Sequence, residues 1–161
     1  MKDSLITHLL VAISGSGASI NAARYAIVMA KLYRCKLTVL YVVDTATLKQ
    51  LSLSKILLPE ESEDYARSLE TNGNRYLAFV EELAKARAVQ IETELRYGNV
   101  ATEIMTAAQE KGADLIVLGG WEKDRDPRDI VGRTHREVQV NSKVSVLVVK
   151  NRDTEQIYRR A

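Results

Sequence analysis

The chain has 161 residues, of which 46% are hydrophobic and 27% charged, and its formal net charge is +2. This length and composition are typical of one globular domain, and the small net charge without a concentrated basic block argues against nucleic-acid binding. Apolar runs such as residues 144–149 are too short to cross a bilayer, and the N-terminal sequence lacks the pattern of a signal peptide. The single cysteine, Cys35, rules out an internal disulfide, fits no cysteine-based metal site and predicts a cytoplasmic protein.

Continuous apolar runs rich in β-branched residues predict five buried strands, separated by helical patterns. The strands are predicted at residues 6–13, 36–43, 89–96, 114–119 and 144–150. Helices are predicted near residues 19–34, 60–87 and 99–111, with a short helix and loop at 45–59. Gly73 is a candidate break in the second of these helices. The alternation implies parallel βαβ units with helices on both faces of one sheet.

The sequence therefore predicts a single α/β domain over residues 1–150. The remaining residues, 151–161, are polar. Such a tail is typical of a frayed end or of a segment that contacts a partner.

The segment 114–134 is the richest in functional signals. A predicted strand runs into Gly119 and Gly120, a charged loop follows, and Gly132 is expected to open a helix. A glycine turn between a strand and a helix N-terminus is typical of a phosphate site, because backbone N–H groups and the helix dipole point at the anion. The acidic residues of loop 122–129 are unsuited to that role, so the segment predicts a nucleotide pocket that has lost or changed its ligand.

The helix after Gly132 has a start signal of its own. Thr134 is followed three residues later by Glu137, which is the spacing of a capping box. Thr134 is therefore expected to be an N-cap residue whether or not a ligand binds.

The colinear order of these segments resembles the universal stress protein (UspA-like) family over about residues 5–150. The resemblance is carried by SGSG after the first strand, then VLYVVD, DLIVLG, Gly132 and the closing VSVLVVK. It implies an adenine-nucleotide α-hydrolase-like fold, an open, doubly wound five-stranded parallel sheet of order 3-2-1-4-5. In such a sheet, ligands bind beyond the carboxyl ends of strands one and four, where the strand order reverses.

The resemblance implies a candidate nucleotide site, with Val42 where an adenine packs in nucleotide-binding members. The candidate residues are Ala12, Ser14, Val42, Gly119, Gly120, Gly132, Arg133 and Thr134. ATP or another adenine nucleotide is the implied cofactor, and no metal is expected.

The motif of the nucleotide-binding members is only partly present. These members have Gly, two residues, Gly, nine residues, then Gly and Ser or Thr; Gly119 and Gly132 match the first and third glycines. Glu122 replaces the second glycine and opposes a polyphosphate by like charge. Ser14 stands where an aspartate usually contacts the nucleoside. Arg133 replaces the hydroxyl residue and either contacts a phosphate or pairs with an acidic side chain and fills the pocket.

No catalytic residue is predicted. His135 has no nucleophile paired with it by sequence logic and is expected to be exposed or to hydrogen-bond the preceding loop. Trp121 is expected to pack over the end of the sheet rather than to stack on a ligand.

Three functions are compatible with these patterns. The leading prediction is a non-catalytic cytoplasmic stress-response regulator that acts as a dimer, binds ATP weakly or not at all, and works through an unidentified protein partner or ligand. The alternative is a nucleotide-binding regulatory module that holds phosphate with the remaining glycines and Arg133. An ATPase or nucleotidyl transferase is least favoured. The dimer is expected to form through Val144, Val146 and Val148, because an apolar edge strand invites pairing.

Overall fold

A computed structural model describes residues 4–120, 130–150 and 153–161, and the side chains of residues 130–132 lie outside that description. Within these residues the chain forms one five-stranded sheet in which every neighbouring pair of strands is parallel, in the order β3-β2-β1-β4-β5. The strands are β1 His8–Ile13, β2 Lys36–Val43, β3 Glu92–Tyr97, β4 Leu115–Gly119 and β5 Ser145–Val149. The predicted fold class and strand order are confirmed.

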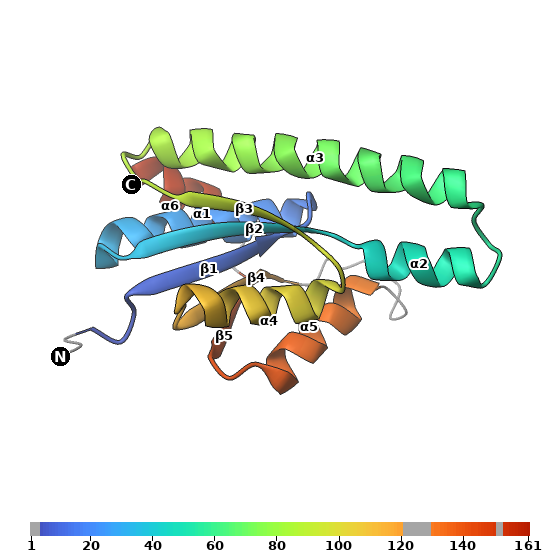
Figure 1. The fold of residues 1–161 in the computed structure, drawn as a ribbon. Coiled ribbons are helices and arrows are strands. Elements are labelled where there is room, and N and C mark those ends of the chain that lie inside the picture. Colours follow the sequence, from blue (N-terminus) through green and yellow to red (C-terminus); the bar gives the residue numbers. More distant parts are fainter. Residues whose placement is uncertain (1–3, 121–129, 151–152) are drawn as a thin grey trace.

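Helices cover both faces of the sheet (Figure 1). α1, α3 and α6 lie over one face, while α4 and α5 lie over the other; α2 lies beyond the end of β2 and packs on α3. The helices are α1 Gly17–Tyr33, α2 Thr45–Leu53, α3 Pro59–Lys85, α4 Val100–Lys111, α5 Ile130–Asn141 and α6 Thr154–Arg160.

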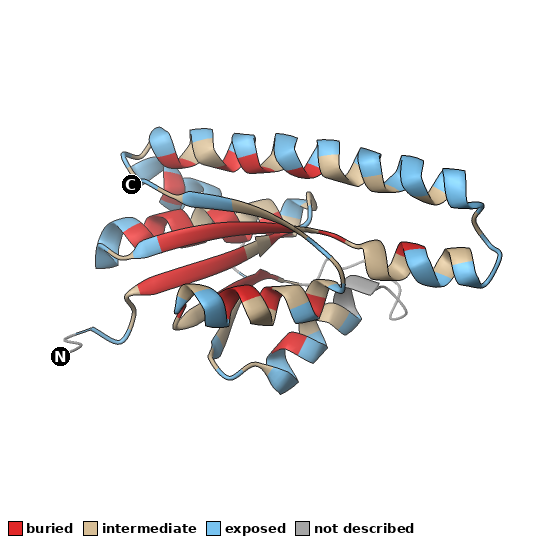
Figure 2. Cartoon of the chain, in the orientation of Figure 1, coloured by how far each residue is buried: buried red, intermediate tan, exposed pale blue. Residues whose placement is uncertain are grey.

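The sheet is buried between two hydrophobic layers because successive side chains of a strand point to opposite faces. Along β1, Leu9 and Val11 pack with α1 and α3, whereas Leu10 packs with α4. All three side chains are fully buried. Figure 2 shows the same pattern, with buried strands at the centre and exposed outer faces on the helices. This double burial explains why strands one, two and four read as continuous apolar runs.

β3 differs from the prediction of a buried strand. It is an edge strand that begins at Glu92, and its residues are half-buried or exposed. Arg96 on β3 forms ion pairs with Glu94, Glu103 and Glu110. Charged side chains of this kind are a common protection of a sheet edge against unwanted pairing.

Gly73 does not interrupt α3, which is continuous from Pro59 to Lys85. The glycine is instead required by packing, because a Cβ at this position would lie 2.5 Å from Cδ1 of Tyr41. The close approach lets the long helix lie directly on β2 and fixes the Tyr41 ring beneath it.

The tail is not frayed where the structure describes it. Residues 154–160 form α6, whose Thr154 and Tyr158 are buried. The Tyr158 hydroxyl donates to the Leu83 carbonyl at 2.7 Å, and the Arg87 Nε donates to the Tyr158 carbonyl at 2.8 Å. The polar composition of residues 151–161 does not reveal this helix, because two buried side chains are enough to anchor it between α1 and α3.

Candidate functional site

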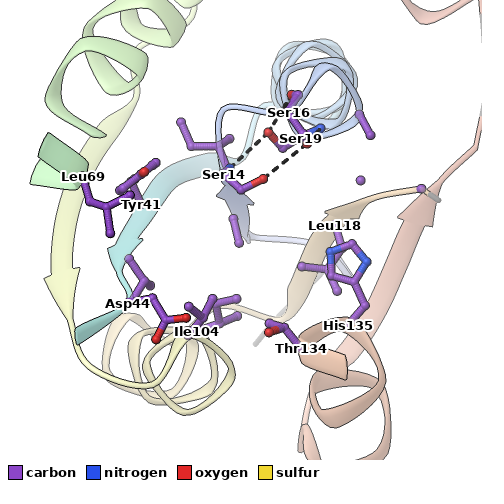
Figure 3. Close-up of a pocket in the computed structure, with 17 residues that line it drawn as sticks. Ser14, Ser16, Ser19, Tyr41, Asp44, Leu69, Ile104, Leu118, Thr134 and His135 are labelled. Carbon is purple, nitrogen blue, oxygen red and sulfur yellow. Dashed lines mark hydrogen bonds between the residues drawn. The ribbon is translucent and has the colours of Figure 1, made fainter. Parts of the chain in front are cut away.

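A cavity of about 200 Å³ lies where the strand order reverses, at the carboxyl ends of β1 and β4 (Figure 3). Its described walls come from β1, α1, β2, α3, α4, β4 and α5. The lining residues are Ala12, Ile13, Ser14, Ser16, Ala18, Ser19, Tyr41, Val42, Asp44, Leu69, Val100, Ile104, Leu118, Gly119, Gly120, Thr134 and His135. Parallel strands that end at one edge bring these distant segments together.

The first wall is the turn from β1 into α1. Ser16 is the N-cap of α1, and its Oγ accepts from the Ser19 N–H at 3.1 Å. The Ser19 hydroxyl donates to the Ser16 carbonyl at 2.9 Å and accepts from the Ser14 N–H at 3.1 Å. The Ser14 hydroxyl donates to Ser16 Oγ at 3.3 Å. The three serines therefore order the turn and present hydroxyl oxygens to the cavity.

A glycine is needed within this turn. Gly15 has a φ of +82°, a conformation that side chains rarely adopt, and a Cβ there would overlap the Tyr76 ring. The Tyr76 ring also stacks on Tyr41, with 6.4 Å between centroids and 22° between planes. Burial, together with the neighbouring Tyr76, raises the pKa of the Tyr41 hydroxyl. This aromatic pair closes the α3 side of the turn.

The second wall is the end of β2. Val42 packs with Ala12, Val100, Ile104 and Leu118 in the hydrophobic layer beneath α4, which makes this side of the cavity apolar. Asp44 follows β2 directly and is the N-cap of α2. The cavity thus has an apolar slot with a carboxylate at its border.

The third wall is the end of β4. A Cβ on Gly119 would lie 2.7 Å from the Ala18 carbonyl carbon and oxygen and 2.9 Å from the Ser19 nitrogen. A Cβ on Gly120 would lie 2.6 Å from the Val149 carbonyl oxygen. Both glycines therefore permit close backbone packing around the cavity, independently of any phosphate.

The last wall is α5, and here the structure corrects the sequence analysis. The helix begins at Ile130, so Gly132 is its third residue and does not open it. Thr134 lies inside the helix and is not its N-cap; it lines the cavity together with His135. The Arg133 side chain is exposed and is not among the described lining residues. Trp121 and the charged loop 122–129, including Glu122, lie outside the described residues.

The cavity brings together most of the residues predicted to form the site. These are Ala12, Ser14, Val42, Gly119, Gly120 and Thr134. Their contact with a ligand stays a prediction. The cavity is also lined by residues that the sequence did not predict as site residues, among them Tyr41, Asp44, Leu69 and Ile104. Asp44 had a usable signal, since a polar residue directly after a buried strand lies at the ligand-binding edge of a parallel sheet.

Comparison with known proteins identifies the family. The model of the universal stress protein family matches residues 6–150. The chain belongs to the universal stress protein family. A universal stress protein of Methanocaldococcus jannaschii is 33% identical over 150 residues, which cover 92% of this chain and 84% of the relative. The universal stress protein YxiE of Bacillus subtilis is 32% identical over 148 residues, 91% of this chain and 100% of the relative.

Solved universal stress protein structures share the fold. A family member from Burkholderia pseudomallei has a TM-score of 0.73 and 22% identity, covering 93% of this chain and 100% of that chain. A universal stress protein in complex with cAMP has a TM-score of 0.64 and 21% identity, covering 91% and 98% of the two chains. A family member from Arabidopsis thaliana with AMP bound has a TM-score of 0.64 and 18% identity, covering 91% and 94%.

Metal sites and membrane spans are both missing from the described part of this universal stress protein. The described residues contain no group of three or more His, Cys, Asp or Glu side chains arranged to hold a metal ion. None of the described helices is both long and apolar enough to span a membrane.

Proposed function

We propose that this stress-response protein is a non-catalytic regulator that binds an adenine nucleotide with few phosphates, such as AMP or cAMP, and binds ATP weakly or not at all. The observation that carries the proposal is the cavity at the strand-order reversal. It combines an apolar slot beneath α4, suited to a base, with the serine turn and the glycines Gly119 and Gly120, suited to a ribose and a single phosphate.

Three further facts support a small phosphate group. Two universal stress proteins of similar fold are described with cAMP and with AMP. No lysine or arginine occurs among the described lining residues, so that part of the cavity offers neither of these two cationic side chains to a polyphosphate. In addition, Glu122 occupies a motif position that is glycine in nucleotide-binding members, which disfavours a triphosphate.

A non-catalytic role is supported by the bonding of the serines. The Ser16 and Ser19 hydroxyls bond to each other's backbone groups, and Ser14 bonds to Ser16. Ser16 caps α1, and the other two hydroxyls bond within the same turn. These are structural tasks, whereas a nucleophilic serine needs a base that takes its proton. An ATPase or nucleotidyl transferase is therefore the less supported alternative.

Thermal unfolding with a nucleotide panel tests the proposed ligand. We expect AMP or cAMP, at about one hundred times its dissociation constant, to add about 2.7 kcal/mol to the free energy of unfolding. For a domain of this size the midpoint should rise by roughly 5–10 °C. Equal concentrations of ATP with magnesium should give a smaller rise. Absence of a shift with every adenine nucleotide would reject the proposed ligand class.

A homodimer through β5 is a second part of the proposal. β5 is an edge strand, and its Val146 and Val148 align with Ile116 and Leu118 of β4. Val144 precedes β5 instead of lying within it, which corrects the predicted strand boundary. The half-buried, apolar character of β5 contrasts with the charged edge at β3. We propose antiparallel pairing of two β5 strands about a two-fold axis.

Multi-angle light scattering at micromolar concentration tests this assembly. We expect the mass of two chains, about twice 18.0 kDa. A monomeric mass at these concentrations would contradict the dimer. The cytoplasmic location and an unidentified protein partner belong to the same proposal; the location is supported by the single cysteine, Cys35.

A further inference from the structure

Asp44 is the one carboxylate among the described residues that line the cavity. It lies beside Ile104, across the cavity from Ser14, Ser16 and Ser19, as Figure 3 shows. Apolar side chains of the layer beneath α4, among them Val42, Ile104 and Leu118, also line the cavity. A purine in the slot with its ribose toward the serines would therefore turn one edge of the base toward Asp44.

The Asp44 carboxylate is held in a fixed orientation. The Thr47 N–H donates to Oδ1 at 3.0 Å, and the Thr47 hydroxyl donates to Oδ2 at 2.8 Å. Each carboxylate oxygen has two lone pairs, so both oxygens keep the capacity to accept a further hydrogen bond. An ionised carboxylate only accepts, and it repels another acceptor placed against it.

We propose that Asp44 determines base specificity by accepting a hydrogen bond from the exocyclic amino group of adenine. The inference rests on the proposed binding of a purine nucleotide in the cavity. A hypoxanthine base has a carbonyl oxygen in place of that amino group. With Asp44 facing the exocyclic position, and not the N1–H that hypoxanthine also carries, this hydrogen bond would be lost and two acceptors would lie face to face, so Asp44 selects adenine over hypoxanthine.

The experiment compares AMP with IMP, which carries a carbonyl oxygen in place of the amino group and a hydrogen on the neighbouring N1. Isothermal titration of the natural chain should give an affinity for AMP at least about tenfold higher than for IMP, as expected for a charge-assisted hydrogen bond. In the Asp44→Asn variant the ratio should fall toward one, because an amide both donates and accepts. Asparagine is as good an N-cap as aspartate, so α2 is preserved.

A matched control separates specificity from helix capping. Asn99 is the N-cap of α4 and accepts from the Thr102 N–H at 3.0 Å, but it is not among the described lining residues. Asn99→Asp makes the reverse exchange at an equivalent capping position, and the ratio of affinities should stay unchanged. The melting temperature of both variants should stay close to that of the natural chain.

The outcomes distinguish a failure of the role assigned to Asp44 from a failure of the proposed nucleotide binding. A ratio that falls in Asp44→Asn and persists in Asn99→Asp supports the assignment. Tight AMP binding by the natural chain with the same ratio in Asp44→Asn overturns the role of Asp44 and leaves the proposed function intact. Failure of the natural chain to bind either nucleotide overturns both.

Discussion

Replacement of Gly119 by alanine is expected to lower the free energy of unfolding by about 2–3 kcal/mol, the effect of forcing extra volume into a packed interior. The new Cβ would lie 2.7 Å from the Ala18 carbonyl group and 2.9 Å from the Ser19 nitrogen. These atoms are backbone of the first turn of α1, so they cannot rotate away as a flexible side chain can. β4 is also fixed, since it pairs with β1 on one side and β5 on the other.

Urea denaturation followed by circular dichroism measures this effect, and Gly112→Ala provides the control. Gly112 ends α4 with a φ of +66°, and a Cβ added to it would meet no atom within 4 Å. Its replacement should cost only the conformational term, about 1 kcal/mol. If Gly119→Ala is no more destabilising than Gly112→Ala, the close approach of α1 to β4 is wrong.

The expected destabilisation by Gly119→Ala indicates that Gly119 has a structural role apart from any ligand. The sequence predicts Gly119 as part of a phosphate cradle, yet its contact with α1 alone requires a glycine. Ala18, Ser19 and Gly119 all line the cavity, so displacement of α1 would also deform any ligand site. The presence of Gly119 in the sequence therefore indicates the family fold more directly than it indicates a phosphate ligand.

The parts of the fold that the sequence predicts are those with a strong local pattern. β1, β2 and β4 are buried on both faces, so they appear as continuous apolar runs. β3 is also predicted as a strand, but its start and its exposure are not, because its edge carries Glu92, Glu94 and Arg96. The predicted start of α5 is wrong because Thr134 and Glu137 have the spacing of a cap, whereas the helix already begins at Ile130.

Only part of the cavity could be predicted from the sequence, because its residues come from two kinds of position. Ala12, Ser14 and the glycines stand at strand ends that the family resemblance identifies. Leu69 and Ile104 lie within helices, where a pattern reveals the buried face but not the cavity that the face meets. Their place in the site depends on long-range packing, which no local sequence signal specifies.

Replacement of Tyr158 by alanine is expected to lower the free energy of unfolding by about 3 kcal/mol, the usual cost of truncating a buried aromatic side chain. Tyr158 is only 6% exposed, and the Arg87 guanidinium carbon lies 4.6 Å from the centroid of its ring. The hydroxyl donates to the Leu83 carbonyl. Chemical denaturation gives the loss, and Tyr158→Phe, which removes only that hydrogen bond, should cost about 1 kcal/mol.

The stabilities of Tyr158→Ala and the natural chain test whether α6 contributes to the folded domain. α6 lies beyond residues 6–150, which match the family model. α6 joins α3 through Tyr158 and α1 through Lys31, whose Nζ donates to the Ala161 carbonyl at 3.0 Å. A frayed tail would make Tyr158→Ala neutral. A loss near the expected value would instead mean that α6 holds α1 against α3. Because α1 begins at the serine turn of the cavity, truncation of α6 should then weaken nucleotide binding without removing any residue that lines the site.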